Sequence, residues 1–155
     1  MPTYQLRGEV PRKRHVQFRD NGRLLTEEVM GLEGFSGNES ILYHLTSPCR
    51  VTKVADFEPI KRDEWVPEGH QHRHFGTMGI EAGGDAISGR RLLMWNQDVE
   101  ISLCRPEEEM DYFFRNGEGD EVIFVHEGKG TLETIFGDVP YAEGDYLVIP
   151  RGTTR

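Results

Sequence analysis

The chain has 155 residues, a formal net charge of −9 and a hydrophobic content of 36%. This length allows one domain with its own core, whereas the acidic balance argues against nucleic-acid binding, which relies on clustered lysine and arginine. The chain has no apolar run near the ~20 residues of a membrane helix and no signal sequence at its start. We therefore expect a cytoplasmic protein without nucleic-acid or membrane partners, in which Cys49 and Cys104 stay reduced.

The sequence of residues 1–90 predicts loosely organised strands, of which Val51–Phe57 is an example. We expect them to form an N-terminal extension that packs on a barrel portion at 91–155, the two making one structural domain. The segment Gly83–Gly89 predicts a flexible loop rather than a phosphate cradle, because it lacks the Lys-Ser/Thr of a P-loop. Glycines and prolines are expected to break the extension at Gly31, Gly34, Gly37, Pro48, Pro59 and Pro67.

Strand patterns dominate the rest of the chain. Leu92–Trp95 and Val99–Leu103 flank the turn residues 96–98 and predict a hairpin. A strand is expected at Glu121–Glu127, turning at Gly128 and returning through Thr131–Phe136. Short strands with frequent turns favour an all-β sandwich or barrel. The remaining predicted features are a turn at Gly137-Asp138 and a strand at Tyr146–Ile149 that Pro150 ends.

The spacing of Glu121, Gly128, Gly144, Pro150 and Gly152 resembles the two motifs of the cupin superfamily. That resemblance implies a cupin-like double-stranded β-helix, a jelly-roll barrel or sandwich, with the strand-rich extension before it. A metal-binding cupin also carries a His-x-His pair before the glutamate and a histidine after the second glycine. Those positions here hold residues without imidazole, namely Phe114, Arg115, Asn116, Gly117 and Arg155.

Three histidines, His70, His72 and His74, form the cluster most suited to a metal. On a strand they would share one face with adjacent rings ~6.7 Å apart along the chain, so two could bind one ion and a carboxylate such as Glu121 would have to complete the site. The alternative is an exposed surface segment, in which His72 and His74 contact another subunit or a substrate.

Glu121 and His126 differ in parity, so on one strand they face opposite sides. In the cupin arrangement Glu121 points inward with Ile123 and Val125, and an inward carboxylate among aliphatic side chains is costly unless it is paired. We expect a structural ion pair in which an arginine neutralises Glu121, and the candidates are Arg115, Arg151 and Arg155.

Several segments in the right order resemble bacterial homogentisate 1,2-dioxygenases over essentially the whole chain. The resemblance implies an iron(II) enzyme of tyrosine and phenylalanine breakdown that opens the ring of homogentisate with O₂ to give maleylacetoacetate, assembled as trimers or hexamers. Its iron is held by two histidines and one glutamate of a C-terminal cupin half. The matching segments are Gly8–His15, Glu28–Gly31, Glu33–Ser36, Leu42–His44, Arg90–Leu92, Asn96, Asp98-Val99, Arg115-Asn116, Gly119–Glu121 and Gly144–Thr154.

The chain matches only the N-terminal part of that family, so we expect it to belong to a longer polypeptide. The missing C-terminal half would then be its partner, together with further copies of the chain and a small aromatic acid as substrate. We expect no iron bound to this chain and assign it no catalytic residue. Two alternatives stay open: a stand-alone degenerate cupin in which Arg115 and Arg151 bind the carboxylate of an aromatic acid, and a metal cupin that uses the histidine cluster with Glu121.

Overall fold

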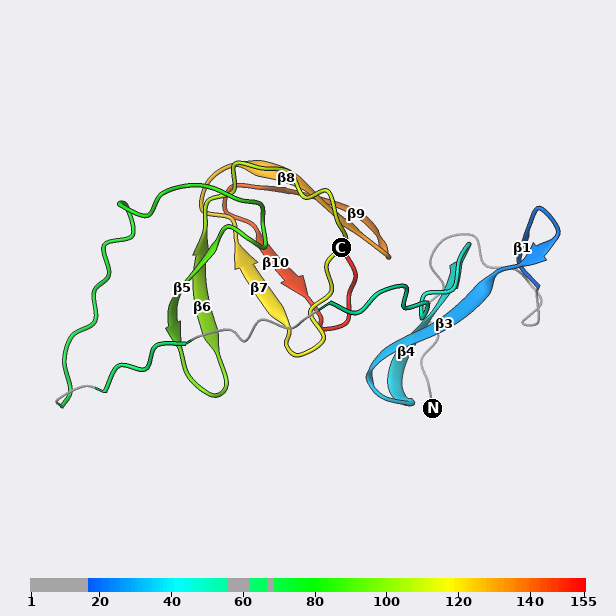
Figure 1. Cartoon of the computed structure of the whole chain (residues 1–155), viewed down its shortest axis with the longest axis horizontal. Helices are drawn as coiled ribbons and strands as arrows, with labels where there is room; N and C mark the ends of the chain where they lie inside the picture. Colours follow the sequence, from blue (N-terminus) through cyan, green and yellow to red (C-terminus); the bar gives the residue numbers. More distant parts are fainter. Residues whose placement is uncertain (1–16, 56–61, 67–68) are drawn as a thin grey trace. The chain divides into compact units, whose positions relative to one another are not determined.

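The computed structural model describes residues 17–55, 62–66 and 69–155, and all regular structure within these ranges is β-strand. The strands pair antiparallel in five two-stranded sheets (Figure 1). The predicted all-β fold is confirmed and is consistent with a cupin-like sandwich, although the described strands do not close into a barrel. The strands are β1 (Arg19–Asp20), β2 (Arg23–Leu24), β3 (Thr26–Glu33), β4 (Ser36–His44), β5 (Arg90–Trp95), β6 (Glu100–Cys104), β7 (Glu121–Phe124), β8 (Lys129–Thr134), β9 (Gly137–Ala142) and β10 (Tyr146–Ile149).

The chain divides into two compact units, Met1–Ile60 and Lys61–Arg155. The packing of an N-terminal extension on a barrel that begins at residue 91 stays a prediction. The segment Gly8–His15 lies outside the described residues, as do Pro59 and Pro67. None of the described residues forms a helix with the length and apolarity needed to cross a membrane.

The first unit contains a long hairpin that the sequence did not predict. Strands β3 and β4 pair from Thr26↔His44 to Glu33↔Ser36, with a register shift between Gly31 and Glu33. The glycines do not break the strands, because Gly34 takes the turn with φ of 64° while Gly31 and Gly37 lie within the two strands. The predicted strand at Val51–Phe57 is wrong for residues 51–55, which are irregular, and its remaining residues lie outside the described ones.

The predicted hairpin of the second unit is confirmed, because β5 pairs with β6 across residues 96–98. The Asn96 side chain shapes the turn, since its Oδ1 accepts the backbone N–H groups of Asp98 and Val99 at 2.8 and 2.7 Å. The Asn96 N–H in turn donates to the Val99 carbonyl at 2.9 Å. This local pattern is one that asparagine commonly provides in turns.

The pairing predicted after residue 121 is wrong. Strand β7 ends at Phe124 and pairs with β10, from Tyr146↔Phe124 to Ile149↔Glu121, rather than with the strand that follows it. The Val125 N–H donates to the Asp145 carbonyl at 2.9 Å, and the Gly144 N–H donates to the Val125 carbonyl at 2.8 Å. These bonds hold the chain after β7 against the turn before β10.

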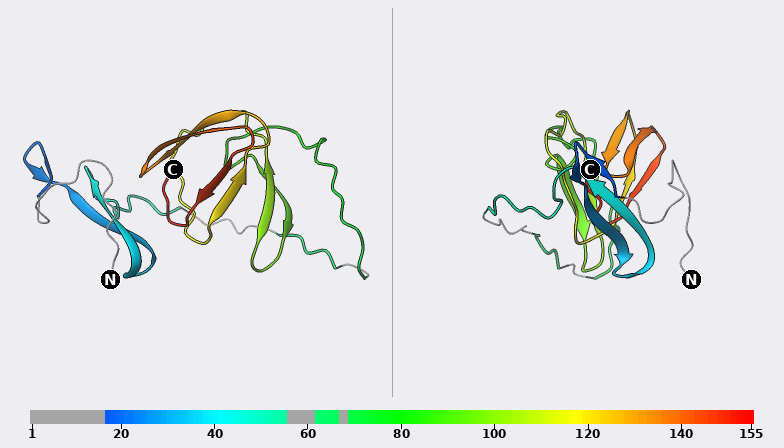
Figure 2. Two further views of the ribbon diagram at one scale, coloured as in Figure 1. Left: turned by 180° about the vertical axis from the view of Figure 1, so that it is seen from behind. Right: turned by 90° about the vertical axis from the view of Figure 1, so that its right-hand side faces the viewer.

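Strand β8 pairs instead with β9, and their turn lies at Ile135-Phe136 rather than at Gly137-Asp138. Thr134 organises this turn, because its hydroxyl donates to the Gly137 carbonyl at 2.8 Å and accepts the Phe136 N–H at 3.0 Å. Within the second unit the β5–β6 and β7–β10 ribbons stand side by side, and the β8–β9 ribbon crosses near one end of β7 and β10 (Figures 1 and 2).

The predicted facing of β7 is confirmed. Glu121 and Ile123 are partly buried and Val125 is buried, whereas His126 is exposed on the opposite side. Ile149 of β10 lies opposite Glu121 in the register and is also buried. A carboxylate therefore sits beside the aliphatic interior of the second unit, where it needs polar partners.

Candidate functional site

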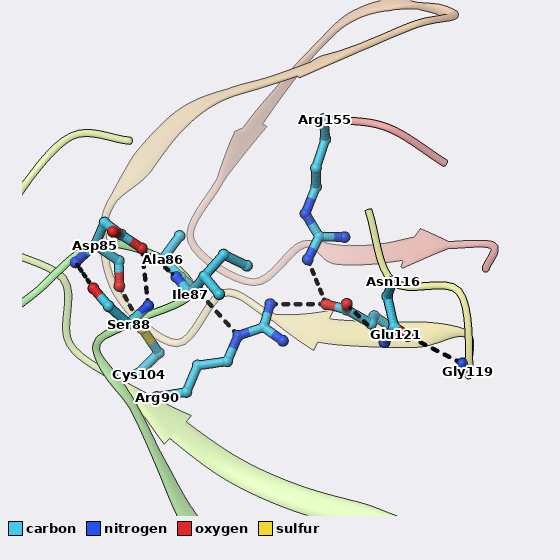
Figure 3. Close-up of polar contacts among 10 residues, drawn as sticks. All are labelled: Asp85, Ala86, Ile87, Ser88, Arg90, Cys104, Asn116, Gly119, Glu121 and Arg155. Atoms are coloured by element: carbon cyan, nitrogen blue, oxygen red, sulfur yellow. Dashed lines mark hydrogen bonds and ion pairs between the residues drawn. The ribbon is translucent and has the colours of Figure 1, made fainter. Parts of the chain in front are cut away.

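Glu121 is the centre of a cluster of charged and polar side chains contributed by three segments (Figure 3). Its Oε2 accepts from the Nη2 of Arg90 at 2.7 Å and from the Nη2 of Arg155 at 2.5 Å. Its Oε1 accepts from the Nδ2 of Asn116 at 3.1 Å. The side chains of Glu121 and Arg155 are only 10% and 5% exposed, so this ion cluster is largely removed from water.

The backbone around residue 114 explains how Arg155 reaches the carboxylate. The Phe114 N–H donates to the Arg155 carbonyl at 2.7 Å, and the Arg155 N–H donates to the Phe114 carbonyl at 3.0 Å. The Arg155 guanidinium also lies 5.2 Å from the centre of the Phe114 ring. Asn116 is fixed separately, because its Oδ1 accepts the N–H groups of Glu118 and Gly119 at 2.9 and 3.1 Å.

The two arginines control the ionisation of Glu121. Burial alone would raise the pKa of this carboxyl, but hydrogen bonds from Arg90, Arg155 and Asn116 outweigh burial and leave the pKa below its ordinary value. Glu121 is therefore a carboxylate at neutral pH, and with two guanidinium groups the cluster carries a net charge of about +1.

Arg90 joins this cluster to a second one built around Asp85. The Arg90 Nε donates to the Ala86 carbonyl at 2.9 Å while its Nη2 binds Glu121 (Figure 3). One arginine of β5 therefore connects the 85–89 turn to the start of β7. The sequence contains no signal for this connection, because Arg90 and Glu121 lie far apart in the chain.

The Asp85 carboxylate organises the glycine-rich segment that we expected to be a flexible loop. Its Oδ1 accepts the N–H groups of Ile87 and Ser88 at 2.7 and 2.9 Å, and the Tyr112 hydroxyl lies 3.0 Å from both carboxylate oxygens. The backbone hydrogen bonds from Ser88 and Ile87 lower the pKa of Asp85 to about 2, with help from Tyr112 and despite burial. The segment is thus a hydrogen-bonded turn around a buried carboxylate.

Cys104 closes the other side of this turn. Its Sγ lies 3.7 Å from the Asp85 carbonyl oxygen. Burial raises the pKa of the Cys104 thiol, with a smaller lowering contribution from Arg90. The thiol is therefore protonated at neutral pH, which does not suit a nucleophile.

Gly89 is required where the turn meets β5, which gives a direct prediction. A Cβ at this position would lie 2.7 Å from the Asp85 carbonyl oxygen and closer still to that of Gly83. We expect Gly89→Ala to destabilise the second unit by about 1–3 kcal/mol, measured by thermal unfolding. Gly79→Ala is the matched control, because a Cβ there meets nothing within 4 Å. Equal melting temperatures for the two variants would contradict the close packing of this turn.

The histidine cluster does not lie on a strand. His70, His72 and His74 lie on an irregular, exposed segment. Within the part of the chain that the structure describes, no three histidine, cysteine or acidic side chains come together in a group that could hold a metal ion. A role of His72 or His74 at a subunit interface or near a substrate stays a prediction.

The other predicted site residues lie close to the Glu121 cluster in the chain. The Arg115 Nε donates to the Thr154 hydroxyl at 2.8 Å, and the Arg151 N–H donates to the Asp120 carboxylate at 2.9 Å. Both arginine side chains are exposed. Of the three arginines expected to neutralise Glu121, Arg155 is at ion-pair distance, and Arg90 is a second partner that was not predicted.

Comparison with known proteins gives a match that covers nearly the whole chain. A protein of Saccharolobus solfataricus named "Putative dioxygenase SSO1533" is 39% identical to this chain over 155 residues. The match covers 99% of this chain but 40% of that protein, so the chain spans about two fifths of the length of the relative. No family model matches the chain, and no solved structure matches it.

Proposed function

We propose that the chain is the N-terminal, non-catalytic part of an iron-dependent, aromatic-ring-cleaving dioxygenase of the homogentisate 1,2-dioxygenase kind. The observation that carries this proposal is the match of nearly the whole chain to two fifths of a protein named as a dioxygenase. The sequence segments that resemble homogentisate 1,2-dioxygenases support homogentisate as the substrate. A dioxygenase-like function without a stated substrate is supported by the relative alone.

The contacts of Glu121 support a structural role for this part. An iron ion would have to compete with these donors for Glu121, because both of its carboxylate oxygens accept hydrogen bonds from Arg90, Arg155 or Asn116. Two guanidinium groups beside the carboxylate would also repel a divalent cation. The described residues therefore do not fit an iron site at Glu121, and the proposal places the iron in another part of the whole enzyme.

In the proposed enzyme this chain has a structural role: its contacts fix the strands of the second unit and do not bind the substrate or the iron. Arg90 connects β5 to β7 through its bond to Glu121. Arg155 connects β7 to the C-terminal segment 152–155, whose backbone pairs with residues 114–116. Together with the Asp85 turn, these contacts hold the second unit in one arrangement. A rigid support of this kind is what a neighbouring catalytic domain requires, because catalytic groups must be held within fractions of an ångström.

A chimaera tests the proposal. The matched segment of the Saccharolobus solfataricus protein would be replaced by this chain, and O₂ uptake would be followed with homogentisate as substrate. We expect one O₂ consumed per homogentisate by the relative and by the chimaera, and none by this chain alone. O₂ uptake by the isolated chain would contradict the non-catalytic role. Failure of the unmodified relative to consume O₂ with homogentisate would contradict homogentisate as the substrate.

A Glu121→Gln variant of the chimaera separates the structural role from an iron-binding one. We expect its iron content per folded protein to equal that of the unmodified chimaera, because Glu121 binds arginines rather than iron. Loss of one iron per subunit with unchanged circular dichroism would show that Glu121 is a ligand and would overturn this assignment.

A further inference from the structure

Two of the four asparagines of the chain, Asn21 and Asn116, are followed by glycine. The backbone nitrogen of the residue after an asparagine can attack the side-chain amide carbon, and glycine favours this attack because it has no Cβ to crowd the approach. The sequence alone therefore offers the same reaction at Gly22 and at Gly117. The structure places the two Asn-Gly pairs in different surroundings.

Asn21 and Gly22 form the exposed turn between β1 and β2. Their φ angles are 47° and 80°, and positive values at both central residues define a type I′ hairpin turn, for which Asn-Gly is a preferred sequence. Among the described residues, the Asn21 side chain makes one hydrogen bond, from its Nδ2 to the exposed Asp20 carboxylate at 3.3 Å. A long bond between exposed groups does little to hold the amide in place.

The hairpin that carries this turn is short. Strands β1 and β2 have two residues each and pair at Arg19↔Leu24 and Asp20↔Arg23. Hairpins of two strands are marginally stable in water, and segments with exposed hydrogen bonds open locally at a low cost in free energy. The closed turn fixes the backbone of the asparagine, and opening frees the rotation that brings its amide carbon to the next backbone nitrogen.

Asn116 is held at both ends of its side-chain amide (Figure 3). Its Oδ1 accepts the N–H groups of Glu118 and Gly119 at 2.9 and 3.1 Å, and its Nδ2 donates to Glu121 at 3.1 Å. Its backbone carbonyl also accepts the Gly152 N–H at 2.6 Å. The three side-chain bonds must break before the amide carbon can turn toward the following backbone nitrogen.

We propose that Asn21 is a site of spontaneous deamidation, whereas Asn116 is protected by its hydrogen bonds. The Gly22 nitrogen forms a bond to the amide carbon of Asn21, and its proton passes through water to the amide nitrogen, which leaves as ammonia. Water then opens the cyclic imide at either carbonyl. The products are aspartate and its isomer, in which the chain continues through the side-chain carboxyl. The reaction needs no oxidant, reductant or cofactor.

The products change the hairpin in two ways. A carboxylate at position 21 replaces the hydrogen bond to Asp20 by repulsion between like charges. The isomer also adds a methylene to the backbone, which a two-residue turn cannot accept while it keeps the register of Arg19↔Leu24. At Asn116 the same reaction would place a second carboxylate beside Glu121, so the bonds of this side chain also preserve the charge balance of the Glu121 cluster.

Peptide mapping by mass spectrometry tests the proposal. The chain is incubated at mildly alkaline pH, where the attacking nitrogen loses its proton more readily, both folded and in guanidinium chloride. We expect folding to slow deamidation at Asn116 by roughly a hundredfold or more, as three hydrogen bonds of ordinary strength would, and to slow it much less at Asn21. The slowing at Asn116 should exceed that at Asn21 by roughly tenfold or more, and a smaller difference would overturn the proposal.

A substitution at position 21 checks the assignment independently. Asn21→Gly retains a residue that accepts a positive φ and removes the amide, so we expect acidic variants of the folded chain to stop accumulating on ion-exchange chromatography. Asn38→Ser is the matched control, because Asn38 is an exposed asparagine of β4 that is followed by glutamate, and accumulation should stay at the wild-type rate. Accumulation at that rate in Asn21→Gly, or its loss in Asn38→Ser, would overturn the proposal.

Discussion

Glu121→Ala is expected to lower the melting temperature of the second unit by roughly 12–24 °C. The substitution leaves the guanidinium groups of Arg90 and Arg155 side by side without the carboxylate that neutralises them. Removing one partner of a buried ion pair costs about 3–5 kcal/mol, and we take about 3 kcal/mol here because Arg90 remains partly exposed. For a unit the size of Lys61–Arg155 each kcal/mol corresponds to roughly 4–8 °C.

Tryptophan fluorescence measures this effect in the right part of the molecule. Both tryptophans of the chain, Trp65 and Trp95, belong to the second unit, so their signal reports the unfolding of that unit. Glu133→Ala is the control, because Glu133 is an exposed glutamate on β8, the next strand along the chain. A shift for Glu121→Ala no larger than that of the control would show that water, rather than the two arginines, satisfies this carboxylate.

Asp85→Asn is expected to lower the melting temperature at neutral pH by several degrees, and the difference from wild type is expected to shrink in acid. The pKa of Asp85 in the folded chain is about 2, below its ordinary value of 3.8, because of the backbone hydrogen bonds from Ser88 and Ile87. A carboxyl with a lowered folded pKa contributes stability that is fully present above the ordinary pKa and is lost as pH falls through the folded value. The difference should therefore be constant above about pH 5 and decline between about pH 4 and pH 2.

Tyr112 provides an independent readout of the same contact. Burial raises the pKa of the Tyr112 phenol, and the hydrogen bond to Asp85 raises it further. In the Asp85→Asn variant we expect this pKa to fall toward its ordinary value, measured by ultraviolet titration with Tyr112→Phe to identify the signal. Asp138→Asn, at an exposed position of β9, should change neither the phenol titration nor the acid profile. An Asp85→Asn melting difference that is constant down to pH 2 would contradict the lowered pKa.

The parts of the fold that depend on residues close together in the chain could be predicted from the sequence. Tyr146–Ile149 was predicted with the correct bounds because an apolar run is followed by a proline, and the β5–β6 hairpin was predicted because Asn96 marks its turn. Strand β9 was missed because it contains Pro140, a residue that sheets accept mainly on edge strands. The β3–β4 hairpin was missed for a related reason, since its glycines suggested breaks instead of a turn and a register shift.

The candidate site was predictable only in part. The resemblance to cupins implied that Glu121 lies on the inner face of its strand, a buried carboxylate there required a cationic partner, and Arg155 fills that role. Arg90 and the Asp85 turn could not be predicted, because their contacts join segments that are distant in the chain and no local pattern records such pairings. The pairing of β7 with β10 rather than β8 is a further choice of this non-local kind.

The nesting of one hairpin inside another orders the steps by which the second unit folds. The segment between Phe124 and Tyr146 contains the whole β8–β9 hairpin. A hairpin closed by a short turn forms within microseconds, and once β8–β9 has formed, the ends of β7 and β10 are joined by a shorter flexible path and lose less chain entropy on pairing. We therefore expect Thr134, at the turn of the inner hairpin, to influence the rate at which the outer pair closes, although it contacts neither β7 nor β10 in the pairing register.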